Sequence, residues 1–150
     1  MLSILRSDSQ NTDFLTLVAQ LDADLSVRDG EEHAFYSQFN KVDMIRHALV
    51  AYQGDRAIGC GAIKALADDT TEVKRMFVLP ELRGQGLAVQ ILEELEAWAR
   101  ELGYTYARLE TGKKQPEAIR LYTKCGYQRI PNYGQYENVE NSVCFEKKLS

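Results

Sequence analysis

The chain has few of the residues that build metal sites and disulfides. Its 150 residues include three cysteines and two histidines. Cys60, Cys125 and Cys144 are odd in number and far apart, so there is no CxxC pair and no zinc-site spacing. The histidines, His33 and His47, are also isolated. We therefore expect no metal and no disulfide, and three free thiols that suit a reducing cytoplasm.

The sequence also lacks long apolar runs and an excess of basic residues. No run approaches the ~20 residues of a membrane-spanning helix, and the first ten residues do not resemble a signal peptide. Its 18 Lys and Arg stand against 22 Asp and Glu, a net charge of −4, whereas a nucleic-acid binder usually carries a basic face. We expect neither a membrane nor a nucleic-acid partner. Without a repeat or linker, the length predicts one domain, residues 1–150.

Hydrophobic periodicity predicts a mixed α/β (α+β) domain with one sheet. The predicted strands are 2–6, 47–52, 57–66, 73–79, 104–110, 127–130 and 142–147. The first helix begins at Asn11 or Thr12 and is interrupted at 28–30. Further helices are predicted at 33–39, 86–102 and 117–125, and a polar loop at 67–70. In the helix 86–102, the apolar residues share one face and the glutamates take the other. We therefore expect the glutamates, including Glu96, to face solvent.

A glycine-rich loop joins the predicted strand 73–79 to the helix 86–102. Gly84, Gly86 and Ala88 let the backbone approach a ligand closely. The unpaired N–H groups and the dipole of a helix start favour phosphate, and Arg83 adds a cation. The loop has no P-loop lysine and does not complete GxGxxG. Spacing alone leaves two interpretations open, a phosphate site and an ordinary turn.

Two segments resemble one known family. Residues 83–88, RGQGLA, resemble the acyl-CoA motif Q/R-x-x-G-x-G/A of the GCN5-related N-acetyltransferases (GNAT). Residues 115–127, QPEAIRLYTKCGY, resemble the second GNAT signature, N-x-x-A-x-x-L-Y-x-x-x-G-F/Y. The similarity covers roughly residues 47–150. It implies a small, bacterial-type, single-domain GNAT fold: a mixed sheet splayed between its fourth and fifth strands, with about four flanking helices.

The resemblance also implies an acetyl-CoA site. Backbone amides would hold the pyrophosphate, and these belong to Arg83, Gly84, Gln85, Gly86, Leu87 and Ala88. Backbone groups of Phe77 and Val78 would pair with the pantetheine arm. Gln115 stands where the family usually has Asn, which contacts the pantetheine or phosphate region.

Three residues are candidates for the chemistry. Tyr122 falls on the family's general-acid position, where its hydroxyl would protonate the leaving thiolate; from the residues alone, core packing is the alternative. Glu72 matches a position where relatives often place an acidic residue, and Glu110 ends the neighbouring strand. Either glutamate would take the proton of an amine, or be a surface charge or ion-pair partner; we rank Glu72 first. Strand alternation puts Glu72 on one face with Lys74, Met76 and Val78.

The acceptor site is predicted at the second helix and the last pair of strands. Tyr133 and Tyr136 would wall a small-molecule pocket, with a surface loop as the equal alternative. The second helix would contribute Phe39, and with it Phe35, Tyr36 and Asn40. Acidic residues at 31, 32, 137 and 140 suit a cationic amine or simply form a solvated face.

Together these patterns predict transfer of an acetyl group from acetyl-CoA to the amine of a small molecule, by direct attack in a ternary complex. Cys125 has no His or cation partner that would activate it for an acyl-enzyme route. The alternatives are a non-catalytic acyl-CoA-binding or regulatory module, an acyltransferase that uses a hydroxyl acceptor or a longer acyl group, and a nucleotide-phosphate enzyme. Family members are often homodimers, which the resemblance extends to this chain.

Overall fold

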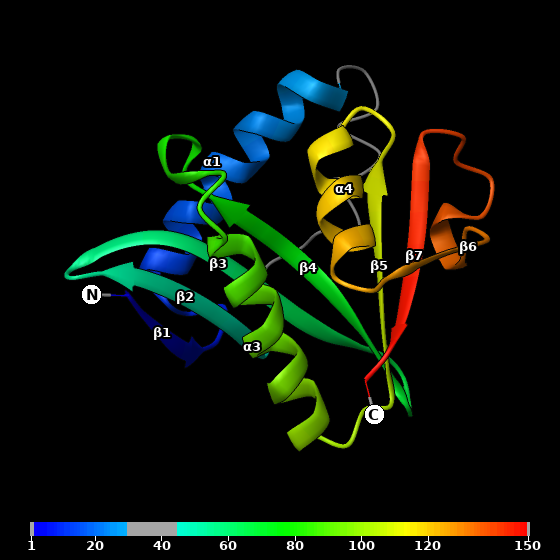
Figure 1. Cartoon of the computed structure of the whole chain (residues 1–150), viewed down its shortest axis with the longest axis horizontal. Helices are drawn as coiled ribbons and strands as arrows, with labels where there is room; N and C mark the ends of the chain where they lie inside the picture. The colour runs from blue at the N-terminus through cyan, green and yellow to red at the C-terminus, as the bar shows by residue number, and fades with distance from the viewer. Residues whose placement is uncertain (1, 30–44, 150) are drawn as a thin grey trace.

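The computed structural model describes residues 2–29 and 45–149. These residues form one seven-stranded sheet in the order β1-β2-β3-β4-β5-β7-β6 (Figure 1). The strands are β1 (Leu2–Ser7), β2 (His47–Gln53), β3 (Arg56–Ala67), β4 (Thr70–Val78), β5 (Tyr106–Gly112), β6 (Gln128–Ile130) and β7 (Ser142–Lys148). The helices of the described segments are α1 (Thr12–Asp29), α3 (Leu87–Glu101) and α4 (Pro116–Lys124), with single 3-10 turns η3 (Pro80–Leu82) and η4 (Gly134–Tyr136). The predicted helix 33–39, with Phe39, Phe35 and Tyr36, and also Asn40 lie outside the described residues.

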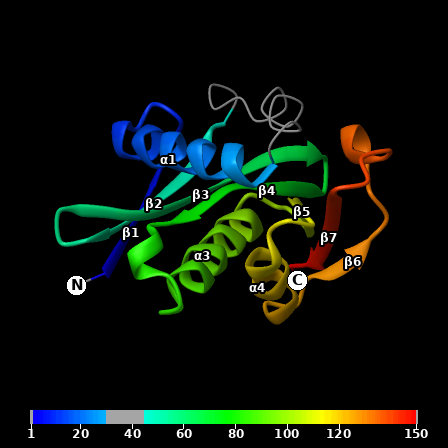
Figure 2. The same cartoon turned by 90° about the horizontal axis from the view of Figure 1, so that it is seen from above.

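Helices cover both faces of the sheet. Figure 2 shows α1 on one face and α3 and α4 on the other. The predicted stripe of α1 is buried against the sheet through Phe14, Leu17, Val18 and Leu21. The apolar face of α3 is also buried, and it includes Ile91, Leu92, Leu95 and Ala99. None of the helices in the described ranges is long and apolar enough to span a membrane.

The sheet splits between β4 and β5, as the resemblance predicts. These strands are parallel, and their pairing runs only from Thr70↔Tyr106 to Glu72↔Arg108. Beyond that point β4 stays paired with β3 and β5 stays paired with β7. Each strand therefore follows its antiparallel neighbour, and the two separate toward their carboxyl ends (Figure 1).

A β-bulge lies in β4 beyond the point of separation. Cys60 pairs with Phe77 and Ala62 with Lys74, so Arg75 and Met76 together stand opposite Gly61. Arg75 has a φ of 59°, a left-handed conformation that is uncommon outside glycine. The bulge interrupts the alternation that the sequence predicts along this strand.

Some predicted boundaries were wrong. The predicted loop 67–70 is only a turn at Asp68 and Asp69, because β3 continues to Ala67 and β4 begins at Thr70. Threonines made this stretch look polar, yet β-branched residues suit strands, and the hydroxyl of Thr71 donates to the Lys64 carbonyl at 3.0 Å. β5 begins and ends two residues later than predicted.

The sequence predicts that Glu96 lies on the solvent face of α3, and that prediction is wrong. Its side chain is 5% exposed. One carboxylate oxygen accepts from the Tyr127 hydroxyl at 3.0 Å, and the other lies 2.8 Å from Lys147 Nζ. The charge of Glu96 can be buried because Tyr127 and Lys147 pair with it. These partners lie 31 and 51 residues further along the chain, so no local pattern predicts them.

Candidate active site

A groove of about 480 Å³ runs between the end of β4, the glycine-rich loop and α4. Most residues predicted to hold the cofactor line it, namely Phe77, Val78, Arg83, Gly84, Gly86, Leu87, Ala88, Gln115 and Tyr122. Gln85 is exposed and does not line the groove. The two sequence segments that carry the motifs therefore face the same space.

The start of α3 has the geometry of an anion site. Gly84 and Gly86 both have a φ of 81°, and a Cβ added at either position would meet no atom within 4 Å. Gly86 is the N-cap and offers no side-chain cap, while its carbonyl accepts the N–H of Gln90. The N–H groups of residues 87–89 precede that first helical bond, so they are open to a ligand.

Arg83 lies at the edge of this groove. Its Nε donates to the Val78 carbonyl at 2.9 Å, and its guanidinium sits 5.5 Å from the centre of the Phe77 ring. One of its terminal nitrogens is 3.9 Å from Asp24 of α1. The side chain therefore engages the same carbonyl that the resemblance assigns to the pantetheine arm.

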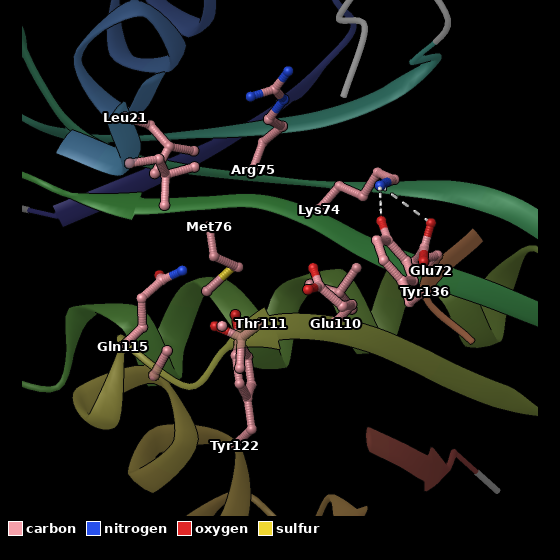
Figure 3. Close-up of a pocket in the computed structure, with 14 residues that line it drawn as sticks. Leu21, Glu72, Lys74, Arg75, Met76, Glu110, Thr111, Gln115, Tyr122 and Tyr136 are labelled. Carbon is pink, nitrogen blue, oxygen red and sulfur yellow. Dashed lines mark hydrogen bonds and ion pairs between the residues drawn. The ribbon is translucent and has the colours of Figure 1, made fainter. Parts of the chain in front are cut away.

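A second, smaller cavity of about 120 Å³ opens where β4 and β5 separate (Figure 3). It is lined by residues of α1, β4, β5 and α4, by Gln115 directly before α4, and by Tyr136 of η4. Its lining shares five residues with the groove: Leu21, Met76, Gln115, Ala118 and Tyr122. The two spaces therefore meet beside Tyr122.

Tyr122 is buried at this junction. Figure 3 shows it pointing from α4 toward the space below Met76. Its ring packs edge-on against Tyr127, with the centroids 5.8 Å apart. Burial raises the pKa of Tyr122 well above its usual value, and the charges of Cys125 and Glu110 raise it further. The hydroxyl is therefore protonated at neutral pH and able to donate.

Glu72 is buried in a network at the other end of the cavity. One oxygen accepts from the Tyr133 hydroxyl at 2.5 Å, and the other lies 3.3 Å from Lys74 Nζ. Lys74 also donates to the Tyr136 hydroxyl at 3.5 Å. Burial raises the pKa of Tyr133 and Tyr136, and Glu72 raises both further. Both carboxylate oxygens of Glu72 are thus engaged within the protein.

Glu110 lines the cavity from β5 and is half-buried. Its charge contributes to raising the pKa of both Tyr122 and Tyr136. It therefore lies within electrostatic reach of both ends of the cavity.

The connection between β6 and β7 is held in place by hydrogen bonds and contributes one residue, Tyr136, to the lining of the smaller cavity. The Asn132 amide donates to the carbonyls of Val139 and Ser142 at 3.1 Å each. Tyr136 is 2% exposed, packs with Cys144 and lines the cavity. Tyr133 does not line the cavity but stacks edge-on against Tyr136 at 5.8 Å and holds Glu72.

Comparisons with known proteins agree with this geometry. Residues 14–127 match the family described as "Acetyltransferase (GNAT) family". The chain belongs to the GNAT family. An IAA acetyltransferase of Azospirillum brasilense is 41% identical over 105 residues, which cover 67% of each chain. A Klebsiella pneumoniae structure classed with the acyl-CoA N-acyltransferases covers 100% of this chain and 99% of its own, at 34% identity and a TM-score of 0.84.

A third relative shares the GNAT fold at lower identity. The PaiA N-acetyltransferase of Thermoplasma acidophilum, solved in complex with coenzyme A, is 17% identical with a TM-score of 0.73, and 99% of each chain is covered. Family membership makes the chain an acetyltransferase, for which acetyl-CoA is the general acyl donor.

The cysteines of this GNAT chain lack the features of an activated nucleophile. Cys60 is buried, its Sγ donates to the Arg75 carbonyl at 3.3 Å, and burial raises its pKa to about 12. Burial also raises the pKa of Cys125 and of Cys144. A thiol becomes a good nucleophile when its pKa falls, so these environments disfavour an acyl-enzyme.

Several residues that line the groove and the smaller cavity were not predicted from the sequence. Arg75 and Thr111 line the smaller cavity, and Arg120 and Lys124 line the groove. Arg120 and Lys124 are four residues apart on α4, a spacing that puts both on one helix face. That signal was available in the sequence. Nothing local marks Arg75, because its placement depends on the register between β3 and β4.

Proposed function

We propose that the chain acetylates the amine of a small molecule, which attacks acetyl-CoA directly in a ternary complex. The observation that carries this proposal is the meeting of the groove and the smaller cavity beside Tyr122. A thioester at that junction would have a protonated hydroxyl on one side and a polar cavity with two glutamates on the other. We also infer that residues 1–150 act as one domain, since a single sheet extends from Leu2 to Lys148.

The groove suits the shape and charge of acetyl-CoA. In our proposal the N–H groups at the start of α3 bind the pyrophosphate, and Arg120 and Lys124 offer further cations to the phosphates. The amide of Gln115 faces the groove without capping α4 and would contact the pantetheine arm. If the Val78 carbonyl pairs with that arm, its oxygen either accepts a second hydrogen bond or exchanges the one from Arg83 Nε for it. The Thermoplasma relative with coenzyme A bound supports this use of the fold.

The proposed reaction balances without a metal or an acyl-enzyme. A carboxylate takes one proton from the substrate ammonium, and the free amine nitrogen attacks the thioester carbonyl. The new C–N bond forms and the C–S bond breaks. Tyr122 donates its proton to the leaving sulfur, the attacking nitrogen loses its second proton to the resulting tyrosinate by way of solvent, and the protonated carboxylate releases the first proton to solvent.

We propose Glu110 as the proton acceptor and Glu72 as a positioning residue. Both oxygens of Glu72 are engaged by Lys74 and Tyr133, so these contacts occupy the positions that a substrate ammonium would take. Glu110 lines the cavity and acts electrostatically on Tyr122. This reverses the order in which the sequence ranked the two glutamates.

The test is thiol release from acetyl-CoA with a panel of small primary amines. We expect amine-dependent turnover that falls ~10²–10⁴-fold in Glu110→Gln. In Glu72→Gln we expect a smaller loss and an unchanged pH profile. Equal losses with equal profile changes in the two variants would contradict the assignment of the base.

The same assay separates the other interpretations. Binding of acetyl-CoA without turnover of any acceptor would indicate a non-catalytic module. Turnover with alcohols alone would indicate a hydroxyl acceptor in place of the amine. Turnover only with longer acyl-CoA donors would indicate transfer of a longer acyl group in place of acetyl.

A further inference from the structure

Arg75 is one of the residues that line the smaller cavity, and its buried guanidinium is incompletely paired. Its side chain is 5% exposed. Nη1 donates to Asp22 of α1 at 2.8 Å. Among the side chains that the structure describes, in residues 2–27 and 45–149, Nε is the single buried nitrogen or oxygen without a hydrogen-bond partner. An orphaned buried donor is costly and rare, and therefore requires an explanation.

The backbone makes the position of Arg75 more unusual. Arg75 is the left-handed residue of the β4 bulge, with a φ of 59°. Bulges next to active sites commonly redirect a side chain, and a strained non-glycine residue persists only where the surrounding structure holds it. Both the strain and the orphaned donor thus fall on one residue of the cavity wall.

Arg75 and the proposed catalytic groups belong to the cavity lining but lie on opposite sides of β4. In Figure 3, Arg75 rises on the side of Leu21, whereas Tyr122, Glu110 and Gln115 lie below β4. A substrate whose amine reaches toward Tyr122 would therefore have its remaining atoms near Arg75. Asp22, the partner of Nη1, has a side chain that is 44% exposed and does not line the cavity.

We propose that the acceptor carries a carboxylate in addition to its amine, as an amino acid does, and that Arg75 binds this carboxylate. Nε and a second guanidinium nitrogen offer the parallel pair of donors that a carboxylate accepts. This inference rests on the proposed function, because it specifies which class of amine the proposed acetylation uses. It replaces the purely cationic amine that the acidic composition suggested.

The proposal can be tested with matched pairs of acceptors. Each pair consists of an amino acid and the amine left by removing its carboxylate: alanine and ethylamine, methionine and 3-(methylthio)propylamine, phenylalanine and phenethylamine. The measurement is kcat/KM by thiol release at saturating acetyl-CoA. We expect the amino acid of at least one pair to be preferred tenfold or more, because hydrogen bonds to charged groups discriminate by that amount.

Two variants assign the preference to Arg75. Arg75→Gln should abolish the preference and leave the KM for acetyl-CoA unchanged. Asp22→Asn removes the ion pair with α1 but keeps the guanidinium, and should preserve the preference. Arg75→Lys serves where Arg75→Gln does not fold; it should reduce the preference, since an ammonium cannot form the bidentate pair.

The outcomes separate this inference from the proposed function. The carboxylate site is overturned if the kcat/KM of the decarboxylated amines matches or exceeds that of the amino acids. It is also overturned if the preference for amino acids survives in Arg75→Gln. Either result leaves the proposal of amine acetylation intact. Without turnover of any amine the proposed function fails, and thermal shifts of the coenzyme A complex then decide the inference. A stabilisation by amino acids that exceeds that by their amines, and that Arg75→Gln loses, supports the site; equal shifts overturn it.

Discussion

Replacing Gly86 by alanine separates the folding of the glycine-rich loop from its binding of the acyl donor. Gly86 has a φ of 81° and a ψ of 6°, and a Cβ there would meet nothing within 4 Å. The unliganded protein would therefore experience backbone strain without a clash. A left-handed conformation costs an L-residue roughly 1–2 kcal/mol, which lowers Tm by ~2–8 °C in a domain of this size.

Gly54 provides the matched control. It lies in the turn between β2 and β3, has a φ of 61°, and also has nothing within 4 Å of an added Cβ. It does not line the groove. Gly54→Ala should therefore lower Tm to a similar extent and leave the affinity for acetyl-CoA unchanged.

The two variants should differ in binding. A methyl group at the start of α3 would displace the pyrophosphate from at least one N–H group. A hydrogen bond to a charged group contributes ~1.5–3 kcal/mol, so Gly86→Ala should weaken acetyl-CoA binding ~10–150-fold. Calorimetric titration measures the affinity, and thermal unfolding without ligand measures the strain. Equal affinities in the two variants would refute the phosphate site at Gly86, and an unchanged Tm would refute the strain argument.

Three further predictions test other parts of the structure. Tyr122→Phe should lower kcat ~10²–10⁴-fold at an unchanged KM for acetyl-CoA; steady-state kinetics that match the parent would remove Tyr122 from the mechanism. In Gly61→Ala, the new Cβ would lie 2.8 Å from Met76 Sδ, so denaturant unfolding should show a loss of about 1–3 kcal/mol. Burial, with a smaller effect of Arg46, lowers the pKa of His47 below 6.5. The unfolded chain then binds a proton that the folded chain resists, so stability should fall as the pH drops through 6.5. His47→Phe should reduce that fall, and an identical pH dependence of Tm would contradict the assignment.

The groove was largely predictable because its elements are local in the sequence. Strand β4, the loop with Gly84 and Gly86, and α3 follow one another, and each has its own signal: an apolar run, left-handed glycines and a helical stripe. The second motif required the family resemblance to bring Gln115 and Tyr122 to the same groove, since β5 lies between the two motifs.

The smaller cavity was much less predictable, because its contacts join distant parts of the chain. The partners Glu72 and Tyr133 are 61 residues apart, and Arg75 and Asp22 are 53 residues apart. Neither composition nor periodicity encodes such pairs, which depend on strand register and on how α1 crosses the sheet. A cytoplasmic location and a homodimer stay predictions of the sequence.

The bulge in β4 connects the local and the distant features of the site. Bulges increase strand twist and end regular pairing, and the ladder between β4 and β5 stops three residues before Arg75, at Glu72. The extra residue requires a small partner, and Gly61 is that partner, since any Cβ there would strike Met76. The bulge thus has two consequences: β4 turns away from β5 to open the junction of the groove and the smaller cavity, and Arg75 becomes part of the lining of that cavity. Moving the irregularity along β4 would alter both together, so we expect the spacing from Glu72 to Arg75 to matter more to this site than the identity of the intervening Val73.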